Sequence, residues 1–346
     1  MKNDLAVKQK KDGRRSRAIL LGLILLLLLL FLFSFVFGRY DIPVGEVVRI
    51  LLCGRLPVEK SWTPQMEAAV LSIRLPRILM ACLVGCCLST AGTAYQCVFR
   101  NPMASPDMLG ATAGAGFGAA LAILKGMSGA AITIMAFLFS LLTVGLVFLL
   151  GSRSRGERVI SLLLAGMMVS SLFSAMTSYI KLVADHSSQL PAITYWLMGS
   201  LSGTRMSTVV RSLLPMGMGL VPLYLLRWRM NLLVLGEEEA EALGVRTGAL
   251  RLAVILSATV ITAASVAASG VIGWVGLVIP HICRRMMGND CRYLIPASML
   301  FGASFLLMSD NIARCAAASE IPIGILTAVI GAPFFIYLMN GRESIL

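Results

Sequence analysis

AILLGLILLLLLLFLFSFVFG, residues 18–38, contains no charged residue. A helix needs about 20 apolar residues to cross the hydrocarbon core of a membrane, so this stretch predicts a spanning helix. The composition agrees, because 58% of the chain is hydrophobic and 14% is charged, whereas about 25% of an average soluble domain is charged. Further long apolar runs cover residues 78–99, 108–124, 126–152, 159–180 and 321–341. The sequence therefore predicts an all-α polytopic membrane protein.

The segment before the first run, residues 1–17, carries seven Lys and Arg residues. A cleaved signal peptide is the alternative, but the apolar part is longer than usual and ends in Phe, Gly and Arg instead of a small-x-small site. We therefore expect a basic cytoplasmic tail at 1–17, followed by a single transmembrane domain at 18–341. Most of the 30 Lys and Arg fall in segments that this topology places inside, which predicts cytoplasmic N- and C-termini.

Several classes of ligand are not expected. The net charge is +13, but the basic residues form no soluble basic face and no nucleic-acid-binding module is present. Gly114, Gly116 and Gly118 do not match either of the common nucleotide-binding glycine patterns. The two histidines, His186 and His281, are expected on opposite sides of the membrane, and the eight cysteines lie mostly in apolar runs without a C-x-x-C pair. We expect no metal site and no cofactor.

The polar turn RNPMASPD, residues 100–107, interrupts two apolar runs. Ser105 is expected to cap the next helix, with Pro106 at its first position. Gly110, Gly114 and Gly118 recur every four residues, and such a small-residue face lets membrane helices pack closely. This stretch is therefore predicted to be a tight hairpin between two packed membrane helices.

The charge-free run between Arg251 and Arg284 is too long for one crossing of a core of about 30 Å. Gly270 and Gly273 offer a break, which would give one helix at 252–270 and a shorter one at 274–287. With this break, about ten crossings are expected. Residues 190–202 are too short to span and are expected to form a half-helix at the outer surface.

The inward loop NLLVLGEEEAEALGVRTG, residues 231–248, alternates apolar residues with four glutamates. It predicts a short amphipathic helix whose acidic face is unsuited to an anionic inner leaflet, and a protein partner explains it better. A solvated charged turn is the alternative. An intramembrane protease motif would need Arg at 242 or 243, where Ala242 and Leu243 stand.

Five segments together resemble one family. They are IRLPRILMACLVGCCLSTAGTAYQCVFRNPMASPDMLGATAGAGFGA (73–119), YWLMGSLSG (195–203), LGEEEAEALGV (235–245), the run GWVGLVIPHICRRMMGNDC to SDNIAR (273–314) and EIPIGILTAVIGAPFFIYLM (320–339). In order and spacing they are similar to the FecCD-type permeases, the membrane subunits of ABC importers for iron chelates, haem and vitamin B12. The resemblance implies an all-α permease of about ten helices in the cytoplasmic (inner) membrane of a bacterium.

The resemblance also implies partners. A second permease subunit, identical or different, two cytoplasmic ATPase subunits and an extracytoplasmic binding protein are expected. The loop at 229–248 would be the coupling helix that docks in the ATPase. The positions that carry this expectation are Gly236, Glu239, Ala240, Leu243 and Gly244. Because the chain has no nucleotide-binding motif, we expect a transport subunit, not an enzyme.

Arg74, Arg77 and Arg314 match positions at which the family presents basic residues to acidic groups of the binding protein. For Arg74 and Arg77, the alternative is interfacial snorkelling. For Arg314, the alternative is a structural ion pair with Asp310, which lies four residues earlier.

One helix carries small hydroxyl side chains ending in Lys181, and the resemblance places this helix along the translocation path. Interhelical hydrogen bonding is the alternative for each of them. The path residues expected are Ser170, Ser174, Thr177 and Ser178.

The expected cargo is a ferric siderophore, with haem or a cobalamin as alternatives carried by the same machine. A proton-coupled secondary transporter would need acidic residues at mid-membrane, whereas Asp185 and Asp310 are expected near the outer ends of their helices. A membrane-embedded enzyme would need a nucleophile and a base and is disfavoured, because His-Glu-x-x-His does not occur in the chain.

Overall fold

The computed structural model describes residues 2–38, 40–53, 60–152, 158–235, 247–317 and 319–340, and these residues form helices and connecting turns without a β-strand. The helices are α1 (Lys2–Ser34), α2 (Val44–Leu52), α3 (Pro64–Ala68), η1 (Ala69–Arg74), α4 (Leu75–Phe99), η2 (Pro106–Leu109), α5 (Ala111–Leu124), α6 (Gly129–Ser152), α7 (Arg158–Val183), α8 (Gln189–Leu197), α9 (Met206–Leu235), α11 (Thr247–Ser269), α12 (Val275–Met287), α13 (Cys291–Cys315) and α14 (Ile323–Asn340).

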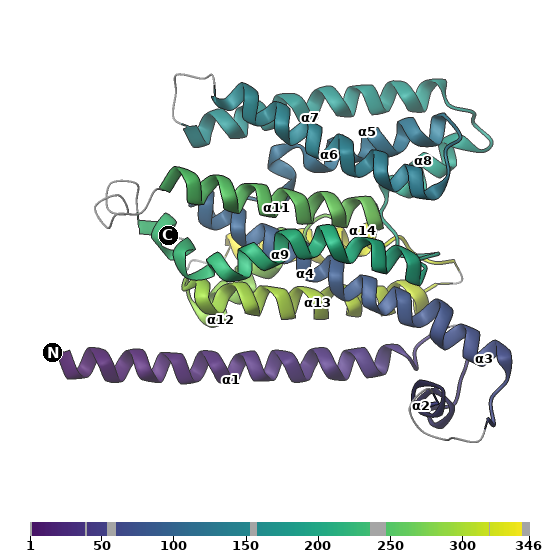
Figure 1. The fold of residues 1–346 in the computed structure, drawn as a ribbon, viewed down its shortest axis with the longest axis horizontal. Helices are drawn as coiled ribbons and strands as arrows, with labels where there is room; N and C mark the ends of the chain where they lie inside the picture. The colour runs from purple at the N-terminus through teal and green to yellow at the C-terminus, as the bar shows by residue number, and fades with distance from the viewer. Residues whose placement is uncertain are drawn as a thin grey trace.

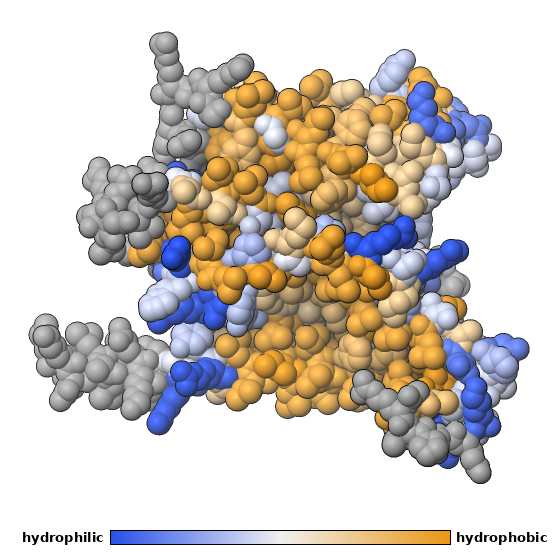
Figure 2. Space-filling view, viewed as in Figure 1, coloured by the Kyte–Doolittle hydropathy of each residue, from blue (hydrophilic) through white to orange (hydrophobic). Residues whose placement is uncertain are grey.

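The long helices lie side by side along one direction, and the short helices α2, α3 and α8 gather at one end of the bundle (Figure 1). We call this end the α8 end and the other the opposite end. The middle of the visible surface is largely hydrophobic, and hydrophilic residues concentrate toward both ends (Figure 2). This distribution is the one expected of a bundle that spans a membrane.

Seven helical segments are long and apolar enough to cross a membrane, and two shorter apolar helices cover Ala111–Leu124 and Ile323–Tyr337. Together with α12, these segments agree with the prediction of about ten crossings. The seven are Gly13–Ser34, Pro64–Phe99, Gly129–Gly151, Ile160–Val183, Met206–Leu233, Thr247–Ser269 and Cys291–Cys315.

Helix α4 lies at the centre of the bundle, and almost all of its side chains are buried. Its neighbours approach closely at glycines. A Cβ at Gly85 would lie 2.3 Å from the carbonyl oxygen of Gly302 in α13, and one at Gly92 would lie 1.8 Å from that of Gly276 in α12. The small residues thus let these helix backbones come into contact. In lipid the hydrophobic effect does not drive helices together, so close van der Waals packing of this kind holds them instead.

The predicted small-residue face of the second hairpin helix is confirmed. A Cβ at Gly114 would lie 2.6 Å from the carbonyl oxygen of Phe139, and one at Gly118 would lie 2.5 Å from that of Met135. Both oxygens belong to α6, so α5 packs on α6 through this face.

The predicted start of α5 differs from the structure. Ser105 precedes the short 3-10 helix η2, but its side chain makes no capping hydrogen bond. The α-helix begins only at Ala111, after Gly110 has turned into the left-handed region with φ of 76°. The Asp107 carboxylate instead accepts a hydrogen bond from the Thr112 hydroxyl.

Two helices begin earlier than their apolar runs. The helix that contains α4 starts at Pro64 and reaches α4 through the π-helical turn η1, and α1 extends back to Lys2 through the basic segment. Hydropathy marks where a helix is apolar, and a polar helical extension leaves no such mark.

The predicted break in the long charge-free run is confirmed. Helix α11 ends at Ser269, Gly270 has φ of 70°, and α12 begins at Val275. The predicted half-helix is present as α8, and the turn after it packs against the break, because the Ser200 amide donates to the Ser269 carbonyl at 2.8 Å.

Candidate functional site

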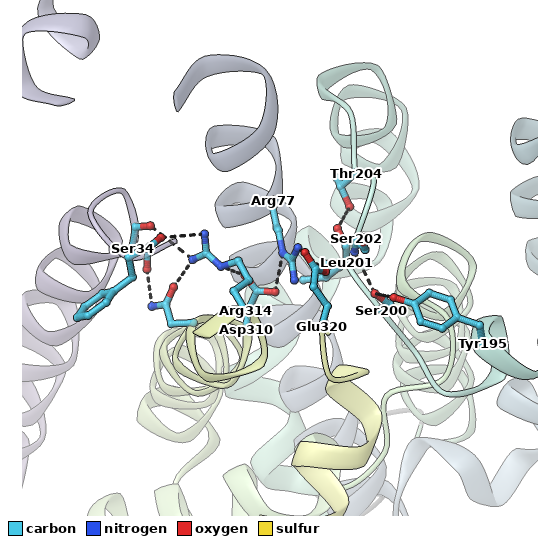
Figure 3. Close-up of polar contacts among 12 residues, drawn as sticks. Ser34, Arg77, Tyr195, Ser200, Leu201, Ser202, Thr204, Asp310, Arg314 and Glu320 are labelled. Atoms are coloured by element: carbon cyan, nitrogen blue, oxygen red, sulfur yellow. Dashed lines mark hydrogen bonds and ion pairs between the residues drawn. The ribbon is translucent and has the colours of Figure 1, made fainter. Parts of the chain in front are cut away.

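Asp310 is the centre of an ion network at the α8 end of the bundle. Its side chain is fully buried and lies between two arginines (Figure 3). Arg77 Nε is 2.9 Å from Asp310 Oδ1, and Arg314 Nε is 3.2 Å from Asp310 Oδ2. Arg77 also extends its Nη1 to Glu320 Oε2 at 2.9 Å. The Asp310–Arg314 pair considered as an alternative is therefore present, and α4 and the segment before α14 join it.

Arg314 and Arg74 also hold the end of α1. The last carbonyls of a helix have no partner within the helix, and a cation there is favourable. Arg314 donates to the carbonyls of Ser34 and Phe37, both at 3.4 Å. Arg74 donates to the carbonyls of Phe35 and Tyr40. The two guanidinium groups thus fasten α1 to the rest of the bundle.

The three predicted docking arginines share one pocket of about 170 Å³. They are only 5–6% exposed, so the pocket is recessed. The three arginines and Glu320 line this pocket, and Asp310 lies within ion-pair distance of Arg77 and Arg314. The remaining lining residues are Gly38, Tyr40, Ala69 and Ile73. Chemically, this arrangement can accept an additional anionic group. Docking of the binding protein here stays a prediction.

The predicted path residues lie on α7 at the edge of its buried side. Thr177 is buried and Ser170 is half-buried, whereas Ser174 and Ser178 are exposed. Thr177 and Ser178 donate to carbonyls of their own helix, at 2.8 and 3.0 Å. Ser170 is in contact with the η2 turn, because its Oγ would lie 2.9 Å from a Cβ at Gly110. Two of the four hydroxyls therefore face away from this subunit.

The predicted coupling residues Gly236, Glu239, Ala240, Leu243 and Gly244 lie outside the described residues. The last turns of α9 before them are described, and they are tied to two other helices. Arg100 at the end of α4 donates from Nε to the Leu233 carbonyl at 2.8 Å. Asn231 donates to Asp290 at 2.9 Å and accepts from the Cys291 amide at 2.7 Å.

Asp290 caps α13 at its N-terminus, since its carboxylate accepts from the Arg292 amide at 3.0 Å. Burial alone would raise the pKa of Asp290, but the hydrogen bonds from Arg292 and Asn231 outweigh it and hold this pKa below its ordinary value. The contact between Asp290 and Asn231 was not predicted from the sequence. An Asp directly before a new apolar run is a cap signal, but nothing in the sequence pairs Asp290 with Asn231, which is 59 residues away.

Known proteins resemble this chain both in sequence and in fold. The chain is 41% identical over 317 residues to the molybdate import system permease protein MolB of Haemophilus influenzae. The matched region covers 92% of this chain and 94% of that relative. It is 38% identical to the hemin transport system permease protein HmuU of Yersinia pestis, over 79% of this chain and 84% of the relative.

A probable iron chelatin transport system permease of Helicobacter pylori is 41% identical over 79% of this chain and 83% of its own. Among solved structures, an inward-facing ABC transporter of the metal-chelate type matches with a TM-score of 0.83 and 40% identity, over 93% of this chain and 99% of that one. The model of the FecCD transport family matches residues 26–340. This helical bundle is therefore a membrane-embedded ABC permease, and the chain belongs to the FecCD transport family.

Proposed function

We propose that this chain is the permease subunit of an ATP-driven importer that moves a ferric siderophore across the bacterial cytoplasmic membrane by alternating access. Two permease subunits would form the path, with the α8 end outside and both termini in the cytoplasm. The excess of basic residues in the segments assigned to the inside supports this orientation. Family membership over residues 26–340 is the observation that carries the proposal.

At the α8 end, the arginine pocket would receive an acidic side chain of the binding protein. Asp310 and Glu320 offset two of the three guanidinium charges in the cluster. Arg74 meets its hydrogen-bonding needs through backbone carbonyls, so its charge stays available to an incoming carboxylate. A charge-assisted contact of this kind in a recessed pocket favours one orientation of the partner.

At the opposite end, the loop at 229–248 would dock on the ATPase. Hydrolysis would be carried out by two partner subunits, because the chain contains no phosphate-binding loop motif. Helix α9 ends at Leu235, within this segment, and its last turns are bonded to α13 through Asn231 and to α4 through Arg100. A displacement of the loop would therefore pass to both helices.

The exposed hydroxyls Ser174 and Ser178 would line the path between the two permease subunits. Weak, neutral hydrogen-bonding groups suit a route that must let cargo pass without retaining it. Thr177 and Ser170 would hold α7 in place behind that surface.

A second cargo has specific support. The relative that covers 92% of this chain is named a molybdate permease, so molybdate joins haem and cobalamin as an alternative. All of these would use the same permease mechanism, and recognition of the cargo would belong largely to the binding protein.

The test is reconstitution of the chain in lipid with a candidate ATPase and binding protein, followed by measurement of ATP hydrolysis and of uptake of radiolabelled iron siderophore or molybdate. A variant with Glu239→Lys and Gly244→Trp should lose both co-purification of the ATPase and uptake. Glu46→Lys, a charge reversal in α2 at the other end, is the matched control and should retain the ATPase. An unchanged complex in the double variant would refute the coupling role.

A further inference from the structure

A groove opens between α6, α9 and α11, near the α8 end of the bundle. Its volume is about 190 Å³. Its apolar lining consists of Ala130, Ile134, Phe137, Pro215, Ala264 and Ala267. Such a cavity on a membrane-embedded surface is filled by apolar groups and not by water.

The groove exists because two helices that touch closely at one level present only small side chains at the next. A Cβ at Gly219 of α9 would lie 2.5 Å from Ser257 O and from Ile261 Cγ2 of α11, so the helices are in contact there. One and two turns nearer the α8 end, α11 presents Ala264 and Ala267 to the groove. Alanines leave unfilled the volume that a larger side chain would take.

The wall of the groove toward the α8 end is polar. Thr208, Arg211 and Ser212 occupy one face of α9, at spacings of three and four residues, and Thr133 of α6 completes the set. Arg211 is exposed, and its Nε donates to the Ser207 carbonyl at 3.0 Å. Within the described part of the chain, no carboxylate lies within ion-pair distance of Arg211.

The position of Arg211 indicates what its partner would be. It lies five residues after the start of α9 at Met206, which is about 8 Å along the helix at 1.5 Å per residue. Helix α9 has 30 residues, so it is about 45 Å long and matches the thickness of a bilayer including its headgroup regions. A residue about 8 Å from its end would therefore lie in a headgroup region, where a cation without a protein partner is paired with lipid phosphate or solvent. Figure 2 shows hydrophilic surface on this face toward the α8 end, bordered by hydrophobic residues.

We propose that the groove is a binding site for one phospholipid of the leaflet at the α8 end. The phosphodiester is bound by Arg211, with the hydroxyls of Thr208 and Ser212 beside it, and an acyl chain lies along Phe137, Pro215 and Ala264. The charge of the guanidinium matches the phosphodiester, and the apolar lining matches the chain below it. The site requires only membrane embedding and is independent of the proposed cargo.

Native mass spectrometry of the detergent-purified protein, titrated with phosphatidylglycerol, tests the site. Arg211→Ala removes the charge-assisted contact and should weaken the tightest lipid-binding step by about tenfold. Ala264→Leu fills the groove and should have a similar effect while leaving the charge in place. Arg205→Ala is the matched control, because Arg205 is also exposed near the start of α9 but does not line the groove.

Equal lipid binding by wild type, Arg211→Ala and Ala264→Leu would overturn the proposal, as would an equal loss in Arg205→Ala, which would indicate general charge attraction. Inorganic phosphate serves as a second probe. If it displaces phosphatidylglycerol at similar concentration, the acyl chain contributes nothing and the lipid assignment fails. The same spectra report the number of subunits, and lipid loss that accompanies loss of a second copy would assign the groove to a subunit interface instead. Arg211→Gln provides a milder variant if Arg211→Ala does not fold.

Discussion

Substitution of Asp310 by alanine should be among the most destabilising single changes at the α8 end. Asp310 is fully buried and makes ion pairs with two arginines that are themselves 93% or more buried. Its removal leaves Arg77 with Glu320 alone and leaves Arg314 without a carboxylate within ion-pair distance among the described residues. Breaking a buried ion pair by removing one partner costs about 3–5 kcal/mol, because the other charge stays buried without compensation.

A matched series separates charge from shape. Asp310→Asn keeps the size and one acceptor oxygen, so we expect a loss of about 1.5–3 kcal/mol, the value of hydrogen bonds to charged groups. Glu320→Ala removes the outer carboxylate, whose side chain is 29% exposed, and we expect about 1 kcal/mol or less. Asp310→Leu combined with Arg314→Leu should be less destabilising than Asp310→Leu alone, because the double variant leaves no unpaired Arg314 charge buried.

The assay is equilibrium unfolding in mixed micelles, followed by intrinsic fluorescence and by protease protection of α1. Protection of α1 should fall in step with stability, because Arg314 donates to carbonyls at the end of α1. A finding that Asp310→Ala costs no more than Glu320→Ala would refute the reasoning. It would mean that water reaches the network and screens the charges.

Three further outcomes are expected. Asn231→Ala removes two hydrogen bonds to the start of α13 and should lower the free energy of unfolding by about 1–3 kcal/mol. The exchange Asn231→Asp with Asp290→Asn can rebuild both bonds and should recover at least half of the lost free energy. If nothing is recovered, the loss is due to packing. Gly92→Ala places a Cβ 1.8 Å from the Gly276 carbonyl oxygen, so purified yield and thermal stability should fall sharply, and a wild-type melting curve would contradict the close approach. Hydrogen bonds from the two serines before α8 lower the pKa of Asp185 to about 2. These contacts are therefore complete above the ordinary carboxyl pKa of about 4 and are lost as pH falls toward 2. Hydrogen-exchange protection at the start of α8 should fall over that interval in wild type and be independent of pH in Asp185→Ala.

Much of the fold could be predicted from the sequence because membrane helices obey a local rule. In lipid, each backbone polar group must be satisfied within its own helix, so length and apolar content mark a helix without reference to its neighbours. The break at Gly270, the half-helix α8 and the close-packed face of Gly114 and Gly118 were all predictable in this way.

The limits of this rule are visible at the helix ends. The helix that contains α4 starts at Pro64 and α1 extends to Lys2, because a polar segment continues a helix without a hydropathy signal. The predicted cap at Ser105 was wrong, since the turn there is a 3-10 helix that closes through the left-handed Gly110. The geometry of this turn depends on its packing against α7. A capping rule considers only residues that are neighbours in the sequence, so it does not take this contact into account.

The sequence by itself determined which apolar segments are long enough to cross a membrane as helices, and that Asp310 and Arg314 lie on one helical face. Only the tertiary structure decided that Arg77 and Glu320 join that pair, over separations of 233 and 243 residues, and that Asn231 bonds to Asp290. The physical reason is that hydropathy and helical periodicity act over a few residues. Ion networks and helix-to-helix hydrogen bonds depend instead on which faces meet when the whole bundle packs.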